Sequence, residues 1–369
     1  MRHIITLSFI VLIYLSTLFL KSPEVYAFEF QPTLINRFFH SQDITHDVPN
    51  RIFLSDGDIH QAAGYIYASG GDPREYNFQH PPFIKYLYGI TTILTGNPYY
   101  MQIILGITLL VSTYALAFQI TKSAIISFTS ALLLSIDPLF ISLSGDLLLD
   151  LGQAAFIVLY LESRLKMRHW LWQGFLLGVL AASKFWAAPL FFVGLLTVYQ
   201  LYQTQQRGSW RKFAFKSFIL HLITAGITFC IVYTQAFIID GGKFNIVFYQ
   251  LKTLKYWLNH SVTTVPGASL MLFLTGYFQS WWGDKEVIRS PIWSWLWPVM
   301  LITATASGIK TLLEKKFPVE AFIALIPLLY LVYLGLQAPF PRYFILVLPF
   351  LYIFTARIIV RKLVRYKRA

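Results

Sequence analysis

The sequence contains little charge and only one cysteine. Charged residues make up 13% of the chain, about half of the ~25% that is usual in a soluble domain. Cys230 stands alone, which excludes a disulfide framework, a zinc site of several thiolates and an iron–sulfur cluster. The chain also lacks a Walker sequence and a glycine-rich nucleotide fingerprint, so an ATP-driven function is disfavoured.

Hydrophobic residues, in contrast, make up 56% of the 369 residues and gather into long runs. A helix of about 20 apolar residues crosses a bilayer, and about ten runs approach that length. We therefore predict an all-α polytopic membrane protein in which residues 1–369 form one membrane-embedded domain. The predicted spans are Ile4–Leu20, Tyr99–Phe118, Ala124–Leu143, Leu147–Leu161, Trp170–Ala182, Trp186–Leu201, Phe218–Ile239, Ile292–Gly308, Ala321–Leu336 and Tyr343–Val360.

The basic residues predict the orientation, because positively charged loops stay in the cytoplasm. The apolar stretch Phe83–Thr95 is too short to cross a bilayer. Placing it as a helix on the outer interface leaves most Lys and Arg, including those of the tail 361–369, in the cytoplasm. Both termini are then cytoplasmic and the protein lies in the plasma (inner) membrane. The net charge of +13 is explained without nucleic acid as a partner.

The first apolar run has a second interpretation. Arg2 precedes a short apolar core, and Val25-Tyr26-Ala27 is similar to the cleavage site of a signal peptide. We favour a retained helix, because the run Ile4–Leu20 approaches the length of a span. The segment that follows lies outside the cytoplasm in either case.

Two large outer segments result, residues 21–98 and 240–291. In the first, the apolar residues of 59–67 recur at helical spacing and predict a short amphipathic helix. In the second, residues 244–258 carry an apolar stripe whose opposite face holds lysines. Tryptophans follow at the outer boundary, as in an aromatic belt. They are Trp281, Trp282, Trp293, Trp295 and Trp297.

Two motifs of the first outer segment stand out. Ser55-Asp56-Gly57-Asp58 precedes the amphipathic helix, and Phe78–Leu87 contains His80-Pro81-Pro82 followed by Lys85-Tyr86-Leu87. These motifs resemble the protein O-mannosyltransferase family and its bacterial relatives, the GT-C membrane glycosyltransferases, which have an acidic motif and a His-Pro-Pro-x-x-Lys-Tyr-Leu segment there. Further segments are similar to the family: Asp137–Phe140, Leu147–Asp150, Gly174–Trp186 with Lys184, Tyr256–His260, Trp281-Trp282 and Pro341–Phe344.

The chain departs from the family in its second acid. The family commonly has Asp-Glu where this chain has Asp56-Gly57, with Asp58 one position later. After the next acidic turn the family often has Ser-Arg, where this chain has Ser144-Gly145-Asp146. The chain is also short for the family.

The resemblance implies a GT-C-like fold and a hexosyl or pentosyl transferase that uses a polyprenyl-phosphate sugar donor. Such a transfer needs a base for the acceptor hydroxyl and positive charge for the departing phosphate. The resemblance implies that Asp56 is the base and that the anomeric carbon is inverted. The acceptor is a protein, a lipid or a glycan. The remaining catalytic candidates are Asp58, Asp146 and Asp150, and the candidates for substrate binding are His80, Lys85, Lys184, His260 and Arg342.

Several of these residues have simpler interpretations. Asp56 or Asp58 could cap the short helix, and Lys184 could only extend toward the interface. Asp146 and Asp150 stay equal candidates for the second acid. No cofactor is required, although Asp56 and Asp58 could hold a divalent cation.

The rival function is a transporter or flippase for a lipid-linked glycan. It predicts acids and broken helices near mid-membrane in both halves of the chain, whereas the acids of this sequence cluster at one outer face. A scaffold protein is disfavoured because Asp150 and Lys184 lie in apolar surroundings, where charge is costly.

Overall fold

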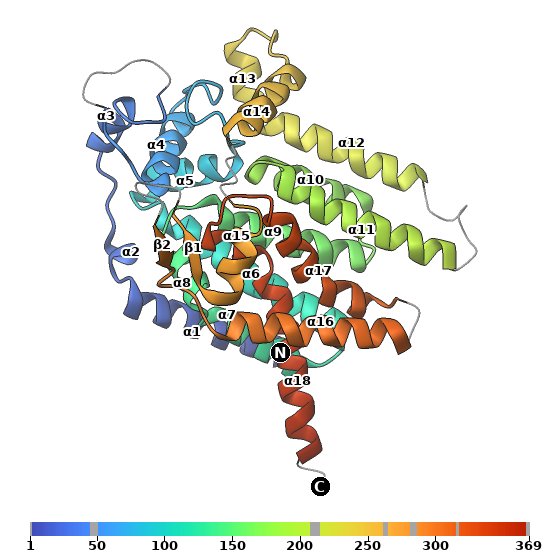
Figure 1. Ribbon diagram of the computed structural model, residues 1–369. Helices are drawn as coiled ribbons and strands as arrows, with labels where there is room; N and C mark the ends of the chain where they lie inside the picture. Colours follow the sequence, from blue (N-terminus) through green and yellow to red (C-terminus); the bar gives the residue numbers. More distant parts are fainter. Residues whose placement is uncertain are drawn as a thin grey trace. The chain divides into compact units, whose positions relative to one another are not determined.

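A computed structural model describes residues 2–44, 51–206, 215–260, 265–280, 286–314 and 317–366. These residues are almost entirely helical, with one short antiparallel hairpin (Figure 1). The elements, in chain order, are α1 Arg2–Lys21, α2 Glu24–Ala27, α3 Thr33–Phe39, α4 Asp56–Ala68, α5 Phe83–Thr95, α6 Tyr99–Thr121, α7 Ala124–Ser135, α8 Pro138–Ser144, α9 Leu149–Leu165, α10 Trp170–Ser183, α11 Ala187–Gln206, α12 Phe215–Val232, α13 Thr234–Ile239, α14 Ile246–His260, α15 Ala268–Thr275, β1 Tyr277–Gln279, β2 Val287–Arg289, α16 Leu296–Glu314, α17 Val319–Leu334, the 3₁₀ helix η2 Pro341–Leu346 and α18 Leu348–Tyr366.

Three helices of the described residues are long and apolar enough to cross a membrane, namely His3–Lys21, Tyr99–Thr121 and Leu296–Glu314. A fourth span results if the bent pair α7 and α8 counts as one. Helices α10, α12 and α17 are apolar but shorter. Length and composition therefore support a membrane protein without confirming the predicted count of about ten spans.

The contacts divide the chain into two compact units. The first unit consists of Met1–Lys21, Ile107–Leu143 and Asn259–Ala369. The second unit consists of Ser22–Gly106 and Ser144–Leu258. Helix α6 therefore begins in the second unit and ends in the first.

In the first unit, α18 packs against α7, α16 and α17, and α1 also packs against α7. The predicted span Ala124–Leu143 is broken, since α7 and α8 meet at an angle of 62°. Pro138 begins α8, and the Asp137 carboxylate accepts the N–H groups of Leu139 (2.8 Å) and Phe140 (3.2 Å). Asp137 is 2% exposed. It also accepts hydrogen bonds from Tyr352 (2.6 Å) and Trp297 (3.1 Å), so it is part of the core of this unit.

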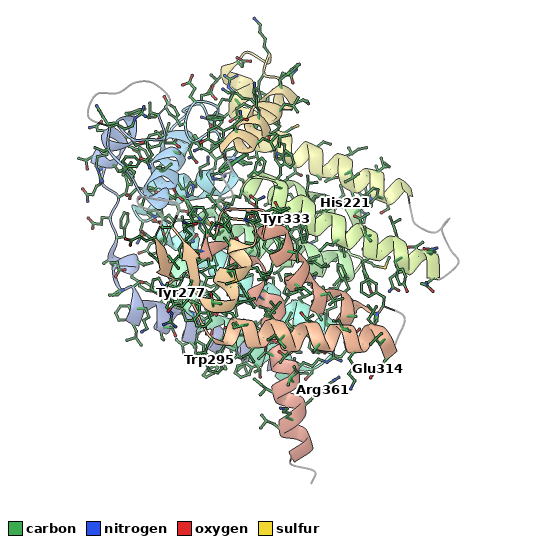
Figure 2. The ribbon with its side chains drawn as sticks, viewed as in Figure 1. His221, Tyr277, Trp295, Glu314, Tyr333 and Arg361 are labelled. Carbon is green, nitrogen blue, oxygen red and sulfur yellow. The ribbon has the colours of Figure 1, made fainter. Side chains whose placement is uncertain are left out.

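Trp297 does not belong to the predicted aromatic belt. Trp297 is fully buried, because its indole packs against Phe273 and donates to Asp137. Trp295 is 65% exposed and Tyr277 is 49% exposed (Figure 2). Trp281 and Trp282 lie outside the described residues.

In the second unit, α4 and α5 lie side by side, as do α10 and α12 (Figure 1). The predicted amphipathic helix of 59–67 is observed within α4, and Phe83–Thr95 forms α5 with the predicted bounds. Gly64 and Gly89 let the α4 and α5 backbones touch. A Cβ atom on Gly64 would overlap the Lys85 carbonyl, and one on Gly89 would overlap the Gly64 carbonyl. The pair therefore forms a closely packed base for the loops at its ends.

Candidate functional site

Most of the predicted site residues belong to the second unit, and three of them, Asp56, Asp58 and Asp146, meet at the first turn of α4. The Ser55 hydroxyl caps this helix by accepting the Asp58 N–H at 3.0 Å. Capping therefore does not depend on the carboxylates of Asp56 and Asp58, which lie in the first turn. Asp56 is exposed and Asp58 is half-buried, and the helix N-terminus favours negative charge at both positions.

The loop before α9 brings Asp146 against this turn. A Cβ atom on Gly57 would overlap an oxygen of the Asp146 carboxylate, so that carboxylate occupies the space beside Gly57. Asp146 itself is half-buried. The absence of a side chain at position 57 thus makes room for an acid from a distant segment.

A set of buried polar groups fixes the loop that carries Asp146. Gln102 donates to the Asp146 carbonyl at 2.7 Å, and the His60 ring lies 3.0 Å from the Leu147 carbonyl. Tyr88 donates to Gln102 at 2.5 Å and is also bonded to the Leu148 carbonyl. Burial raises the pKa of the Tyr88 phenol well above its usual range, and the nearby charges of Asp146 and Asp150 raise it further.

The sequence prediction missed these supporting residues. His60 follows Asp56 by one helical turn, so their shared face was visible in the sequence. Tyr88 and Gln102 gave no comparable signal in the sequence. The carbonyls to which they donate, those of Leu148 and Asp146, lie 60 and 44 residues away along the chain.

Asp150 and Lys184 form a buried ion pair. Their Oδ1 and Nζ atoms are 2.5 Å apart, and the two side chains are 2% and 11% exposed. Asp150 lies in the first turn of α9, and Lys184 follows the last residue of α10. Asp146 and Asp150 therefore differ in surroundings: Asp146 borders the α4 carboxylates, whereas Asp150 holds a lysine.

Lys85 is fully buried and bound to the loop that precedes it. Its ammonium donates to the carbonyls of Asn77 (2.7 Å) and His80 (2.8 Å) and to the Asn77 amide oxygen (3.0 Å). Burial lowers the pKa of this amine to about 7. Lys85 thus fixes the position of the segment that contains His80, and its predicted contact with substrate stays a prediction.

His80 is half-buried between two aromatic rings. Its ring centroid is 5.1 Å from that of Trp257 in α14 and 5.9 Å from that of His60 in α4. Trp257 also donates to the Gln79 carbonyl at 2.8 Å. His80 therefore lies between the first turns of α4 and the helix α14.

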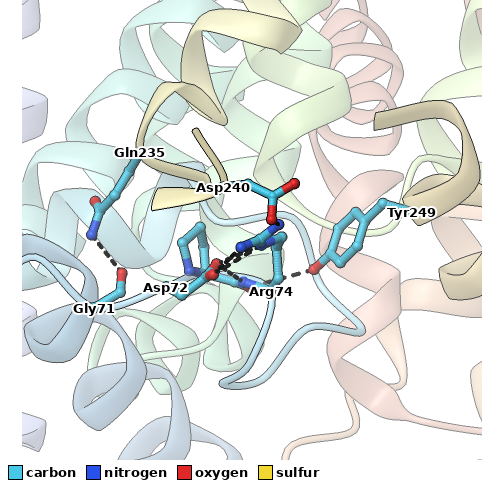
Figure 3. A network of polar contacts seen from close by, with 7 residues as sticks. Gly71, Asp72, Arg74, Gln235, Asp240 and Tyr249 are labelled. Carbon is cyan, nitrogen blue, oxygen red and sulfur yellow. Dashed lines mark hydrogen bonds and ion pairs between the residues drawn. The ribbon is translucent and has the colours of Figure 1, made fainter. Parts of the chain in front are cut away.

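A second polar network joins the same loop to α13 and α14 (Figure 3). Arg74 is bonded to Asp72 (2.6 Å) and to Asp240 (3.1 Å), and these bonds raise the pKa of its guanidinium. Gln235 donates to the Gly71 carbonyl, and Tyr249 donates to the Pro73 carbonyl at 3.4 Å. Residues 71–74 of the first outer segment are thus bonded to residues 235–249 within the second unit.

The last two candidates, Arg342 and His260, belong to the first unit. The Arg342 guanidinium lies over the rings of Phe340 (4.7 Å) and Tyr343 (5.7 Å). The backbone of His260 ends α14, and its side chain lies outside the described part of the structure. Substrate binding by both residues stays a prediction.

No group of three or more His, Cys, Asp or Glu side chains within the described ranges is arranged to hold a metal ion. The divalent cation at Asp56 and Asp58 therefore rests on the sequence pattern alone.

No protein-family model and no curated protein matches the sequence. Solved structures do match. ArnT from Cupriavidus metallidurans bound to undecaprenyl phosphate superposes with a TM-score of 0.63 at 15% identity, over 89% of this chain and 59% of that chain. Its apo state gives a TM-score of 0.57 at 16% identity, over 89% and 58%. The apo oligosaccharyltransferase from Archaeoglobus fulgidus gives a TM-score of 0.59 at 15% identity, over 99% and 51%.

These similarities concern the fold, and the chain spans only 51% to 59% of the length of these two proteins. Both are GT-C proteins. The expectation drawn from the sequence motifs is confirmed at the level of the fold: the chain shares the fold of these two proteins, which is the GT-C-like fold that the motifs predict.

Proposed function

We propose that the protein is a glycosyltransferase that moves a monosaccharide from a polyprenyl-phosphate donor to an acceptor hydroxyl. The observation that carries this proposal is the meeting of Asp146 with the α4 turn that holds Asp56 and Asp58. These acids are accessible, unlike Asp150, and a group that takes a proton from a bound acceptor must be reachable. The GT-C fold supports the same reaction class.

In the proposed reaction Asp56 acts as general base. Its carboxylate accepts the proton of the acceptor hydroxyl while the hydroxyl oxygen bonds to the anomeric carbon. The bond from that carbon to the donor phosphate oxygen breaks, and the polyprenyl phosphate leaves with the electron pair. Attack from the face opposite the leaving group inverts the anomeric carbon.

The departing phosphate carries negative charge that a cation must stabilise. We propose Lys184 for this role, with Asp150 holding its ammonium in place. His80, His260 and Arg342 are further candidates for contact with the phosphate or the sugar. Asp146, fixed by His60 and Gln102, would orient the acceptor or the sugar beside Asp56.

The donor constrains where this chemistry takes place. A polyprenyl tail stays in the bilayer, so the reaction occurs at the membrane interface. We propose the outer face of the plasma (inner) membrane, with both termini in the cytoplasm, from the distribution of basic residues. The transferred sugar is a hexose or a pentose, and the acceptor is a protein, a lipid or a glycan. The side chains that surround the sugar and the acceptor, rather than the acids, determine this choice.

A reconstituted assay tests the proposal. Purified protein in vesicles is given radiolabelled polyprenyl-phosphate sugars, and the release of polyprenyl phosphate is measured with and without acceptor hydroxyls. A transferase releases polyprenyl phosphate only when an acceptor is present. Movement of intact donor across the bilayer without such release would support the flippase instead.

A further inference from the structure

Helix α14 exposes large apolar side chains, although it lies in a predicted outer segment. Val247 is 65% exposed, Phe248 70%, Leu251 53% and Leu258 72%. The predicted stripe of residues 244–258 is thus divided, because Phe244 is only 8% exposed. A contiguous apolar surface of this kind in a folded protein indicates a binding partner.

The opposite face of α14 is already occupied. Tyr249 and Phe244 belong to a buried aromatic cluster with Tyr233 and Ala236. Trp257 is bonded to the Gln79 carbonyl, and Thr253 is 2% exposed. One face of α14 therefore packs on the loop that holds His80, and the apolar face points away from that core.

Positive charge accompanies the exposed apolar face. Lys252 and Lys255 are both exposed and follow Phe248 by one and two helical turns, so they lie beside the apolar side chains and not on the opposite face that the sequence predicted. The Lys252 ammonium also lies 4.9 Å from the centre of the Phe78 ring. The one acid between the start of α13 and the end of α14, Asp240, is bonded to Arg74. The exposed face therefore combines apolar side chains with positive charge that no acid of these two helices neutralises, which is complementary to an anionic surface.

The two helices that precede α14, the apolar helix α12 and the short helix α13, also expose large apolar side chains. Along α12, one side carries isoleucines that are exposed to increasing extents: Ile219 36%, Ile223 51%, Ile227 56% and Ile231 63%. In α13, which follows directly, Ile238 is 73% exposed. Exposed apolar side chains are thus present on α12, α13 and α14 in succession, as is expected of a segment that stays in contact with lipid.

We propose that α14 is an in-plane helix that lies on an anionic phospholipid surface. Val247, Phe248, Leu251 and Leu258 enter the acyl boundary, and Lys252 and Lys255 bind the phosphate headgroups. The lipid surface would thereby fix the helix whose other face positions Gln79 and His80.

Depth-dependent quenching tests this proposal independently of catalysis. In a Cys230→Ser background, Phe248→Cys is labelled with an environment-sensitive fluorophore in vesicles that contain a brominated phospholipid. Glu75→Cys is the matched control, because Glu75 is exposed on the loop that packs against the buried face of α14. We expect brominated lipid to quench position 248 and not position 75. Equal quenching at the two positions, or quenching of 248 by aqueous iodide alone, would overturn the proposal.

The anionic preference is tested in the same protein. Vesicles of mixed phosphatidylglycerol and phosphatidylcholine carry bromine on one lipid or the other. Each lysine at the surface is worth about 1 kcal/mol, which corresponds to roughly fivefold local enrichment of anionic lipid. Brominated phosphatidylglycerol should therefore quench position 248 more strongly, and Lys252→Gln with Lys255→Gln should remove the difference. Equal quenching by both lipids in the protein that retains its lysines would contradict the headgroup contact.

Discussion

Two groups of acids in the second unit differ in their access to water. Asp56 is exposed and Asp58 is half-buried, both in the first turn of α4, and the half-buried Asp146 borders that turn. Asp150 and Asp72 are 2% and 7% exposed, and each is bonded to a cation. Buried carboxylates need such partners because an uncompensated charge in the interior is costly. The comparison supports our proposal that the accessible acids act on substrate, whereas the buried acids hold the structure through their cations.

The largest expected effect separates the two groups directly. Asp56→Asn removes a base worth about 10²- to 10⁴-fold in rate, while Ser55 continues to cap α4. We expect transfer from a polyprenyl-phosphate sugar to be lost, with expression and thermal stability nearly unchanged. Near-normal transfer by this variant would exclude Asp56 as the base.

Asp58→Asn provides the matched control, since both acids lie in the first turn of α4. We expect a smaller loss of activity than for Asp56→Asn. Adding a chelator to the unmodified protein tests the divalent cation separately, because only a metal-dependent reaction would be inhibited.

Breaking the buried pair should affect stability rather than chemistry alone. Asp150→Asn leaves the Lys184 ammonium without its carboxylate, and loss of one partner of a buried pair costs about 3–5 kcal/mol. We expect a large fall in the thermal unfolding midpoint. The double variant Asp150→Leu with Lys184→Met should recover stability and still transfer sugar poorly. If Asp150→Asn unfolds at the normal temperature, the pair does not hold α9 to α10.

A methyl group at Gly57 tests the contact between α4 and Asp146. Gly57→Ala would overlap the Asp146 carboxylate, so this flexible, half-buried side chain must turn away. We expect the unfolding midpoint to change little and sugar transfer to fall, because the acid leaves its place beside the α4 turn. Gly194→Ala is the control, because a Cβ atom there meets open space. Transfer by Gly57→Ala at the rate of Gly194→Ala would contradict a role for the Asp146 carboxylate at this position.

The last expected effect is a gradual pH dependence of stability at Lys85. The pKa of its amine is about 7 in the folded protein against an ordinary value of 10.5, so the unfolded chain binds more protons between these values. Stability should therefore rise as pH increases from about 7, by at most about 1.4 kcal/mol per unit. Unfolding measured at several pH values should show this rise, and Lys85→Met should abolish it. An unchanged slope in that variant would assign the rise to another group.

The sequence predicted the local features of this fold better than its long-range contacts. Phe83–Thr95 was bounded by Pro82 and Gly96, and the helix has those limits. The span Ala124–Leu143 was predicted as one continuous helix, because the run is apolar throughout. In the structure it is broken at Asp137 and Pro138.

The candidate site shows the same division. Asp56 and Lys184 were visible as charged residues in distinctive surroundings. The pairing of Lys184 with Asp150 and the contact of Asp146 with Gly57 join segments far apart in the chain, so no local spacing reports them. Lys85 was predicted to bind substrate from its motif, and only the tertiary structure reveals its neutral oxygen partners.

The close packing of α4 on α5 also limits how a lipid can approach. At Gly64 and Gly89 the two backbones already touch, so no side chain can be accommodated between them. A polyprenyl tail is bulkier than a methyl group and cannot enter this seam. In the reaction that we propose, a lipid-linked donor would therefore reach Asp56 by a path around the helix pair.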